Sequence, residues 1–217
     1  MQKFILFLLI YGSGLSLVQA QQDWPFYVNI QGFKKQDSIS MPKKGGILFV
    51  GSSSIGRWTT LKNNFSDYHI IQRGFGGSEY KDIEHYVEDI IFPYRPSKVF
   101  LYAGENDFVK GRTVDEVYNT VFSIYSMIRR RLPETLIYII SVKPSEKLIA
   151  HAEAISAVNN KLKQFIDTKP GYIKYIDIHT PMLNGDKMPR TELFVKDKLH
   201  LSSSGYAIWE EAVRKFM

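Results

Sequence analysis

Short apolar runs alternate along the chain with longer segments in which apolar residues recur every three or four positions. The short runs are typical of strands buried on both faces of a parallel sheet. They occupy residues 47–50, 69–73, 98–103, 136–142 and 172–178. The amphipathic segments predict helices over residues 79–91, 114–131, 148–167 and 202–216, after a first helix that begins near Ile55. This alternation of strands and helices predicts an α/β fold, with a parallel sheet of five strands covered by helices on both faces.

Glycine-containing turns follow the first three predicted strands, at 51–54, 74–78 and 104–107. In an open parallel sheet, function gathers in the loops at the carboxyl ends of the strands, so we expect these turns to lie together. Gly51 is expected to supply backbone angles that other residues resist. Ser53, which follows it on a strand-to-helix turn, is a candidate nucleophile. From this stretch alone, the plainer interpretation is a serine whose hydroxyl only hydrogen-bonds to backbone groups of the turn.

Composition limits the classes of function. The chain has 217 residues, of which 44% are hydrophobic and 23% charged, as expected of one globular domain. Its formal net charge is +6, but the basic residues form short clusters and no continuous stripe. Nucleic acid is therefore not an expected partner. The absence of cysteine excludes a disulfide framework and a thiolate metal site.

The first residues have the pattern of an export signal. Lys3 precedes an apolar run over residues 4–11, and small residues lead to Ala20. We therefore expect a signal peptide over residues 1–20 and an exported protein, periplasmic or secreted. The run is short for a bilayer span, so no stable membrane insertion is expected after cleavage, although an uncleaved anchor is the alternative. Residues 21–44 are interpreted as an N-terminal extension packing on a domain over residues 45–217.

A second cluster of reactive residue types lies just before the last predicted helix. Asp197 and His200 stand three positions apart, so the carboxylate can reach Nδ1 of the imidazole and leave Nε2 free toward Ser53. The backbone N–H groups of Ser53 and Gly77 and the side-chain amide of Asn106 are candidate donors to an oxyanion. Each feature also has a plain interpretation, as a surface ion pair, a turn or a helix cap.

Taken together, four blocks make the chain resemble the SGNH (GDSL-type) hydrolases, a lipase and acylhydrolase family, from about Trp24 to Trp209. The blocks are Gly51-Ser52-Ser53, Arg73-Gly74-Phe75-Gly76-Gly77, Gly104-Glu105-Asn106-Asp107 and Asp197-Lys198-Leu199-His200. The resemblance implies a three-layer, flavodoxin-like α/β/α sandwich and an SGNH hydrolase domain over residues 45–217. It also implies ester hydrolysis without a metal or other cofactor, by a triad of Ser53, His200 and Asp197 with Ser53, Gly77 and Asn106 as the oxyanion hole.

Two positions depart from the family pattern. Ser52 replaces the aspartate of the GDS motif, and Ser78 replaces the aspartate that follows the second-block glycine. Neither change removes a reacting group. The implied substrate is a small-molecule or glycan ester with a short acyl group, such as an O-acetyl group on a carbohydrate. Lysophospholipid and thioester substrates remain open.

The residue types are also compatible with two other classes of function. A metal hydrolase could use Asp177, His179, Asp197 and His200. A non-catalytic carbohydrate-binding protein of the same fold could use exposed aromatic side chains, for which Trp24, Trp58 and Tyr80 are the candidates.

Overall fold

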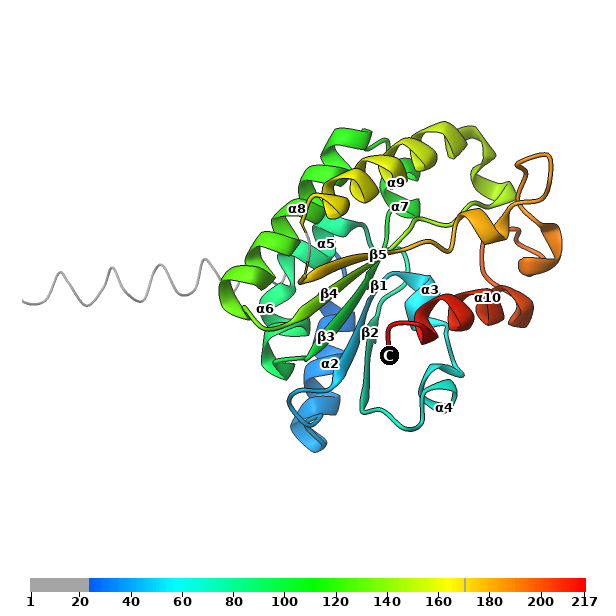
Figure 1. Cartoon of the computed structure of the whole chain (residues 1–217). Helices are drawn as coiled ribbons and strands as arrows, with labels where there is room; N and C mark the ends of the chain where they lie inside the picture. Colours follow the sequence, from blue (N-terminus) through cyan, green and yellow to red (C-terminus); the bar gives the residue numbers. More distant parts are fainter. Residues whose placement is uncertain (1–23, 170) are drawn as a thin grey trace, which may run out of the picture.

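The chain forms one five-stranded sheet covered by helices on both faces (Figure 1). This computed structural model describes residues 24–169 and 171–217, so the predicted signal peptide over residues 1–20 lies outside the described residues. The strands are β1 (Ile47–Gly51), β2 (Ile70–Gly74), β3 (Lys98–Tyr102), β4 (Leu136–Ile140) and β5 (Ile173–Ile176), in the order β2-β1-β3-β4-β5. All neighbouring pairs are parallel, which confirms the predicted α/β/α fold.

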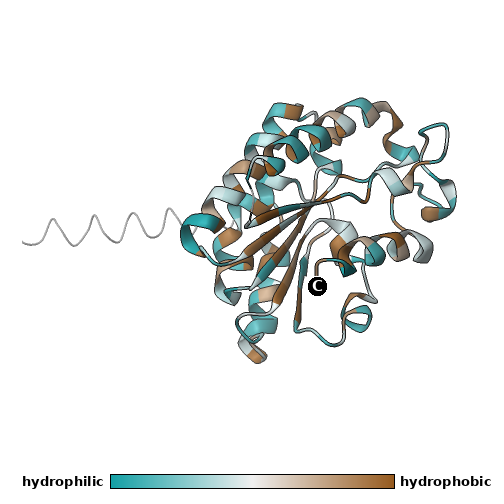
Figure 2. Ribbon diagram, viewed as in Figure 1, coloured by the Kyte–Doolittle hydropathy of each residue, from teal (hydrophilic) through white to brown (hydrophobic). Residues whose placement is uncertain are grey.

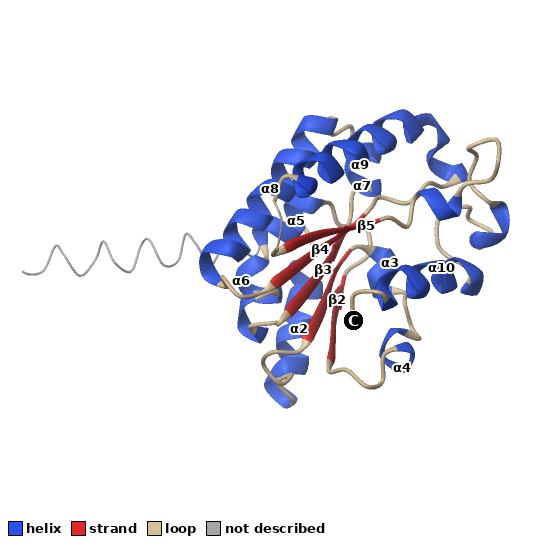
Figure 3. Ribbon diagram, in the orientation of Figure 1, coloured by secondary structure: helices blue, strands red, loops and turns tan. Residues whose placement is uncertain are grey.

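Helices of very different length form the two outer layers (Figures 1 and 3). One face is covered by α2 (Tyr27–Ile39), α5 (Tyr80–His85), α6 (Val87–Ile90), α8 (Val114–Arg131) and α9 (Ala152–Asp167). The other face is covered by α3 (Ser53–Gly56), α4 (Leu61–Asn64) and α10 (Ser203–Arg214). The connections include α7 (Glu105–Val109) and the 3-10 turns η1 (Phe92–Tyr94), η2 (Glu146–His151), η3 (Thr180–Met182) and η4 (Thr191–Leu193).

The strands divide the core into two layers because successive side chains of a strand point to opposite faces. In β1, Leu48 and Val50 contribute to the cluster under α8 and α9, whereas Ile47 and Phe49 contribute to the cluster under α10. All residues of β1 are buried. The strands accordingly run as apolar segments through the centre of the molecule, with polar helix surfaces outside (Figure 2). Burial on both faces is why a strand such as β1 was predictable from a continuous apolar run.

Helix boundaries agree with the sequence in one case and differ in others. The helix predicted over residues 114–131 is α8, and Thr113 caps it by accepting the N–H of Glu116 at 3.2 Å. The helix predicted over 79–91 is broken at Tyr86, where the backbone leaves helical geometry between α5 and α6. The helix predicted from Leu148 begins at Ala152, because Leu148 lies in η2 with non-helical angles. The first helix begins at Ser53, two residues before Ile55, and is four residues long.

The N-terminal extension contains a helix, α2, that the sequence did not predict. Among its residues only Ile30 is fully buried, so the segment lacks the apolar stripe that marks an amphipathic helix. Specific contacts hold this region to the domain. The Trp24 indole stacks on the ring of His85 at 4.1 Å and donates to Asp82 at 3.2 Å, and Asp37 pairs with Arg73. Within the described part of the chain, no helix has both the length and the apolar character needed to cross a membrane.

Candidate active site

The three glycine-containing turns meet at one edge of the sheet. Gly51, the last residue of β1, pairs with Gly74 at the end of β2 and with Tyr102 at the end of β3. A Cβ on Gly51 would lie 2.0 Å from the Tyr102 carbonyl oxygen and 2.9 Å from Ile55 Cγ1. Gly51 does not have a positive φ, so the expectation that it supplies unusual backbone angles is wrong. Glycine is needed here because the neighbouring strand and α3 approach the backbone closely.

Ser53 lies at the start of α3, immediately after the extended residue Ser52. A Cβ on Gly76 would lie 3.6 Å from Cβ of Ser53, so the turn after β2 passes directly beside the serine. Ser52 is buried, and its hydroxyl has no hydrogen-bond partner among the described residues. The position that holds an aspartate in the GDS motif is therefore occupied here by a small, uncharged group inside the protein.

The structure brings Ser53, His200 and Asp197 into one hydrogen-bonded relay. Nε2 of His200 lies 3.1 Å from the Ser53 hydroxyl oxygen, and Nδ1 of His200 lies 2.6 Å from Oδ2 of Asp197. A neutral imidazole that donates from Nδ1 to the carboxylate leaves Nε2 as an acceptor toward the serine hydroxyl. The arrangement can therefore take up the serine proton.

The turn that follows Asp197 stabilises its side chain in the ionised form. Its Oδ1 accepts the backbone N–H groups of Leu199 at 3.0 Å and of His200 at 2.9 Å. The hydrogen bond from the His200 ring, together with these backbone N–H groups, holds the pKa of the Asp197 carboxyl well below its usual range. Lys198, between them, has a φ of 58°, a left-handed conformation that makes the turn tight enough for both contacts.

Contacts between its two ends close the loop of Asp197 and His200, and a further contact joins the following helix to α3. Phe194 and Leu201, on either side of the loop, pair as an isolated antiparallel bridge. The N–H of Val195 donates to the His200 carbonyl at 2.9 Å. Beyond the loop, the Tyr206 hydroxyl donates to the Ser54 carbonyl at 3.0 Å and so joins α10 to the helix that carries Ser53. These contacts set the distance between imidazole and serine.

The candidate oxyanion donors come from the turns after β2 and β3. Gly77 has a φ of 86°, which favours glycine, and Asn106 is the second residue of α7. The Asn106 side-chain amide donates to the Ser78 carbonyl at 3.0 Å, and this bond ties the two turns together. An amide nitrogen carries two hydrogens, so one remains for a ligand. Ser78, at the other departure from the family pattern, is buried and donates to the Phe75 carbonyl at 2.9 Å.

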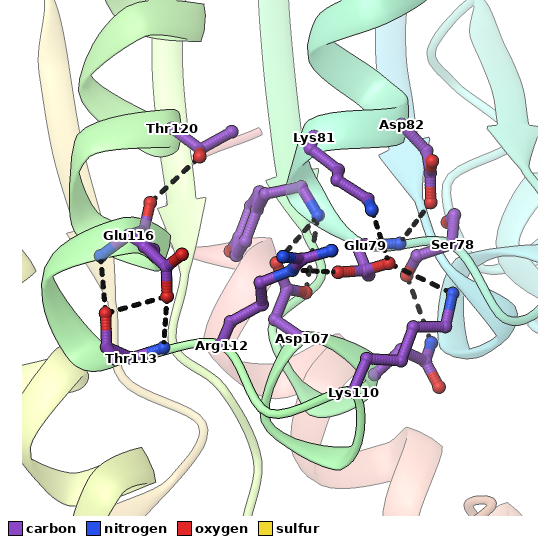
Figure 4. A network of polar contacts seen from close by, with 12 residues as sticks. Ser78, Glu79, Lys81, Asp82, Asp107, Lys110, Arg112, Thr113, Glu116 and Thr120 are labelled. Carbon is purple, nitrogen blue, oxygen red and sulfur yellow. Dashed lines mark hydrogen bonds and ion pairs between the residues drawn. The ribbon is translucent and has the colours of Figure 1, made fainter. Parts of the chain in front are cut away.

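A charged network supports these turns from behind (Figure 4). The buried Glu79 carboxylate pairs with Lys81 at 3.3 Å, Lys110 at 3.0 Å and Arg112 at 2.8 Å. Asp107, the residue after Asn106, accepts the N–H of Tyr80 at 3.1 Å. Burial raises the pKa of the Asp107 carboxyl to about 7, and the charges of Glu79 and Asp82 act in the same direction. The network links α5 to α7 behind the candidate oxyanion donors.

Sequence reasoning missed two groups near the site. Glu105 and Lys143 form a buried ion pair directly beside Asn106, although Lys143 belongs to none of the four sequence blocks. Phe26 was expected only to pack on the domain as part of the N-terminal extension, but its ring lies 3.7 Å from the position that a Cβ on Gly77 would take. The sequence feature that could have indicated this pair is the position of Lys143, a charged residue directly after a mostly apolar strand.

The structure does not assemble the sites that the two other classes of function need. Trp58 and Tyr80 are fully buried, so they cannot be the exposed aromatic side chains expected of a carbohydrate-binding surface. The His179 ring contacts the Val142 carbonyl through Nδ1 at 2.9 Å, and Asp177 accepts the N–H of Thr180. Across residues 24–169 and 171–217, no three His, Cys, Asp or Glu side chains lie close enough together to hold a metal ion.

Comparison with known proteins gives one sequence-level match and many structural ones. The sequence profile of the GDSL-like Lipase/Acylhydrolase family matches residues 45–208. No curated protein sequence matches the chain significantly.

Three solved structures illustrate the structural similarity. A protein of Streptococcus pneumonia, which its description links to platelet activating factor, is 19% identical, with a TM-score of 0.77 over 94% of this chain and 98% of its own. A GDSL-like lipase of Bacteroides thetaiotaomicron is 18% identical, with a TM-score of 0.75 over 86% of this chain and 96% of its own. A variant of a Geobacillus acetyl-xylooligosaccharide esterase is 17% identical, with a TM-score of 0.63 over 79% and 94%.

Proposed function

Because the chain belongs to the GDSL-like lipase/acylhydrolase family and is an ester-hydrolysing enzyme, we propose that Ser53, His200 and Asp197 are its catalytic triad. The observation that carries this proposal is the relay itself. The His200 ring lies 3.1 Å from the serine hydroxyl on one side and 2.6 Å from a carboxylate on the other. These distances are within hydrogen-bond reach, as a nucleophile, a base and an orienting group require.

In the proposed reaction, the Ser53 hydroxyl attacks the ester carbonyl carbon while Nε2 of His200 takes its proton. Asp197 keeps Nδ1 protonated and stabilises the imidazolium that forms. The carbonyl oxygen becomes an oxyanion, which the N–H groups of Ser53 and Gly77 and the Asn106 amide stabilise. The imidazolium protonates the leaving alcohol. A water molecule, deprotonated by the same imidazole, then releases the acid and restores the serine.

We propose a short acyl group, with acetyl first, and an alcohol that is carried on a carbohydrate. The triad lies near the surface, since the side chain of Asp197 is 47% exposed and that of His200 is 18% exposed. Such a site leaves room on the histidine side for an alcohol that extends into solvent, as an acetylated sugar does. The similarity to an acetyl-xylooligosaccharide esterase supports this choice of substrate class.

A chain-length series of p-nitrophenyl esters tests the proposal, with the wild type and Ser53→Ala measured in parallel. We expect the wild type to prefer acetate and Ser53→Ala to lose turnover by ~10⁴-fold or more without a change in Tm. Retained turnover in Ser53→Ala would exclude the triad. A preference for long acyl chains would favour a lysophospholipase or thioesterase. Background rates from both proteins on these esters and on acetylated xylooligosaccharides would favour the carbohydrate-binding alternative.

We also propose that the protein is exported, on the pattern of its first residues. Lys3, the apolar run over residues 4–11 and Ala20 support a cleaved signal peptide. Expression of the full chain in a bacterial host, followed by fractionation and mass spectrometry, tests this directly. We expect a mature N-terminus near Gln21 in the periplasmic or secreted fraction. An intact N-terminus in the membrane fraction would identify an uncleaved anchor.

A further inference from the structure

A completely buried lysine lies just after β4. The side chain of Lys143 has no exposed surface, and its Nζ pairs with Oε1 of Glu105, whose side chain is 6% exposed. The other carboxylate oxygen, Oε2, accepts the Tyr102 hydroxyl at 2.6 Å. Burial and the Glu105 charge raise the pKa of Tyr102 well above its ordinary value, so the hydroxyl remains a donor. A buried ion pair adds little to the free energy of unfolding, because the loss of hydration of both charges offsets their attraction. Its role is therefore argued from its location beside Asn106.

Glu105 lies directly before Asn106, at the first position of α7. The turn that delivers both residues is tight, because Gly104 has a φ of 110°. A Cβ on Gly104 would lie 2.5 Å from Cγ2 of Val142, the residue before Lys143. The segment after β4 therefore touches the turn that carries Asn106 through two successive residues: Val142 by packing and Lys143 by charge.

The segment after β4 is itself held firmly. The Asn159 side chain on α9 accepts the N–H of Val142 at 2.8 Å and donates to the Val142 carbonyl at 2.9 Å. The Ser141 hydroxyl oxygen accepts the N–H groups of Ile178 and His179 at 2.9 and 3.0 Å. The backbone next to Lys143 is therefore held in place by hydrogen bonds. A lysine on a fixed backbone can fix the position of its partner, Glu105.

Lys143 also faces the loop that carries the proposed base. Its Nζ lies 5.8 Å from the ring centroid of Phe194, within range of a cation–π contact. Phe194 pairs with Leu201, the neighbour of His200. The ammonium group therefore sits between the turn that carries Asn106 and the loop that carries His200.

We propose that Glu105 and Lys143 are a positioning pair that fixes Asn106 for oxyanion stabilisation in the reaction proposed above. The carboxylate anchors the first turn of α7 at two points, Tyr102 and Lys143, and Asn106 follows it without a flexible residue between them. An oxyanion donor must be held in place before reaction, because its effect depends on preorganised geometry. Neither Glu105 nor Lys143 touches the substrate in this proposal. Both act through Asn106.

The test removes the charge of Glu105 and asks whether the loss passes through Asn106. We expect Glu105→Gln to lower kcat by about 10- to 100-fold on p-nitrophenyl acetate, with KM changed by less than about 3-fold. In an Asn106→Ala background, the same substitution should lower kcat by less than about 2-fold, because the donor is already absent. If the fold-losses in kcat of Glu105→Gln and Asn106→Ala multiplied in the variant that carries both, the proposal would be overturned.

Two further variants keep the result interpretable. Glu105→Gln leaves Lys143 unpaired in the interior and can fail to fold. The double variant Glu105→Gln/Lys143→Met removes the unpaired charge, so it should recover stability while kcat stays low. Asp37→Asn breaks a comparable pair, with Arg73 and the Tyr94 hydroxyl, between α2 and β2. It should lower Tm and leave kcat within about 2-fold of the wild type. Wild-type kcat in a folded Glu105→Gln/Lys143→Met variant would overturn the proposal.

A readout that needs no turnover separates this proposal from the proposed function. In nitrogen-15 NMR spectra, the side-chain amide of Asn106 should shift in Glu105→Gln/Lys143→Met and stay in place in Asp37→Asn. An unmoved Asn106 amide in the first variant would overturn the positioning role even if Ser53→Ala confirms the triad. A shifted amide in a protein that hydrolyses no ester would support the positioning of Asn106 and refute the proposed function alone.

Discussion

Nε2 of His200 lies 3.1 Å from the hydroxyl oxygen of Ser53, although the two residues stand 147 positions apart in the chain. The serine is delivered by the first strand of the domain and the histidine by the loop before the last helix. Asp197, in contrast, is three residues from His200 and is held by the same turn. The proposed base and its proposed orienting group are thus a local unit, and one long-range contact completes the relay.

Replacing Asp197 by asparagine should disable the relay without unfolding the protein. Asparagine can accept from Nδ1 only in one orientation, so the imidazole loses the partner that selects its tautomer. We expect kcat to fall by ~10³–10⁴-fold. The Asp197 side chain is 47% exposed, so Tm should barely change. Steady-state kinetics and thermal denaturation check both expectations, with the exposed Asp186→Asn as control. An activity loss that is matched by a loss of Tm would contradict the assigned role.

Replacing Asn106 by alanine should affect turnover more than substrate binding. Loss of a single oxyanion donor typically lowers kcat by ~10²–10³-fold. The substitution also removes the bond to the Ser78 carbonyl, so Tm should be recorded together with kcat and KM. Asn119→Ala, at an exposed position of α8, is the matched control and should behave as the wild type. A rise in KM with unchanged kcat would assign Asn106 to ground-state binding.

Three glycine-to-alanine substitutions separate backbone strain from crowding. Gly185 has open space around it, and alanine there should change the unfolding free energy by less than about 0.5 kcal/mol. Gly111 has open space but a φ of 79°, which should lower stability by ~1 kcal/mol. Gly104 combines a φ of 110° with a close approach to Val142, so alanine there should lower the free energy of unfolding by ~3 kcal/mol or more. Urea denaturation gives the order, and equal losses at Gly104 and Gly111 would show that the contact relaxes.

The buried carboxyl of Asp107 should make stability depend on pH. Burial raises its pKa from 3.8 to about 7. Between these values the folded state keeps a proton that the unfolded state has released, so stability is full below about pH 4 and is lost as pH rises through 7. The slope is at most about 1.4 kcal/mol per pH unit.

Asp107→Asn should remove this dependence, since asparagine can still accept the Tyr80 N–H. Tm measured at intervals from pH 4.5 to 7.5 should therefore fall less with rising pH in Asp107→Asn than in the wild type. Asp67→Asn, at an exposed position, controls for the change in net charge. Parallel curves for all three proteins would show that Asp107 is ionised throughout this range in the folded state.

The sheet was predictable from the sequence, whereas the outer elements were only partly so. Strands such as β1 are buried on both faces, so their sequence is a continuous apolar run that leaves little choice. The helix α2 buries only Ile30 and is held instead by single contacts such as Trp24 with His85. Contacts of this kind depend on the partner's position in space, which no local periodicity encodes.

The candidate site shows the same division. Ser53, Gly77, Asn106 and His200 were recognisable because each belongs to a short block whose members are adjacent in sequence. The pairing of Glu105 with Lys143 joins residues 38 positions apart from two different strand ends, so it became visible only in the structure. Gly51 was identified correctly as a special position but for the wrong reason, because the Tyr102 carbonyl that crowds it belongs to the neighbouring strand.

The placement of the two ends of the described fold has a practical consequence. Trp24 bonds to Asp82 on α5, and Phe26 lies against Gly77, so the N-terminal segment enters along the rim of the candidate site. The carbonyl of Phe216 instead accepts Nζ of Lys98, at the start of β3 and therefore at the opposite edge of the sheet. An affinity tag or a surface linker is better attached after Met217, where it leaves the approach of an ester substrate to the candidate site unobstructed.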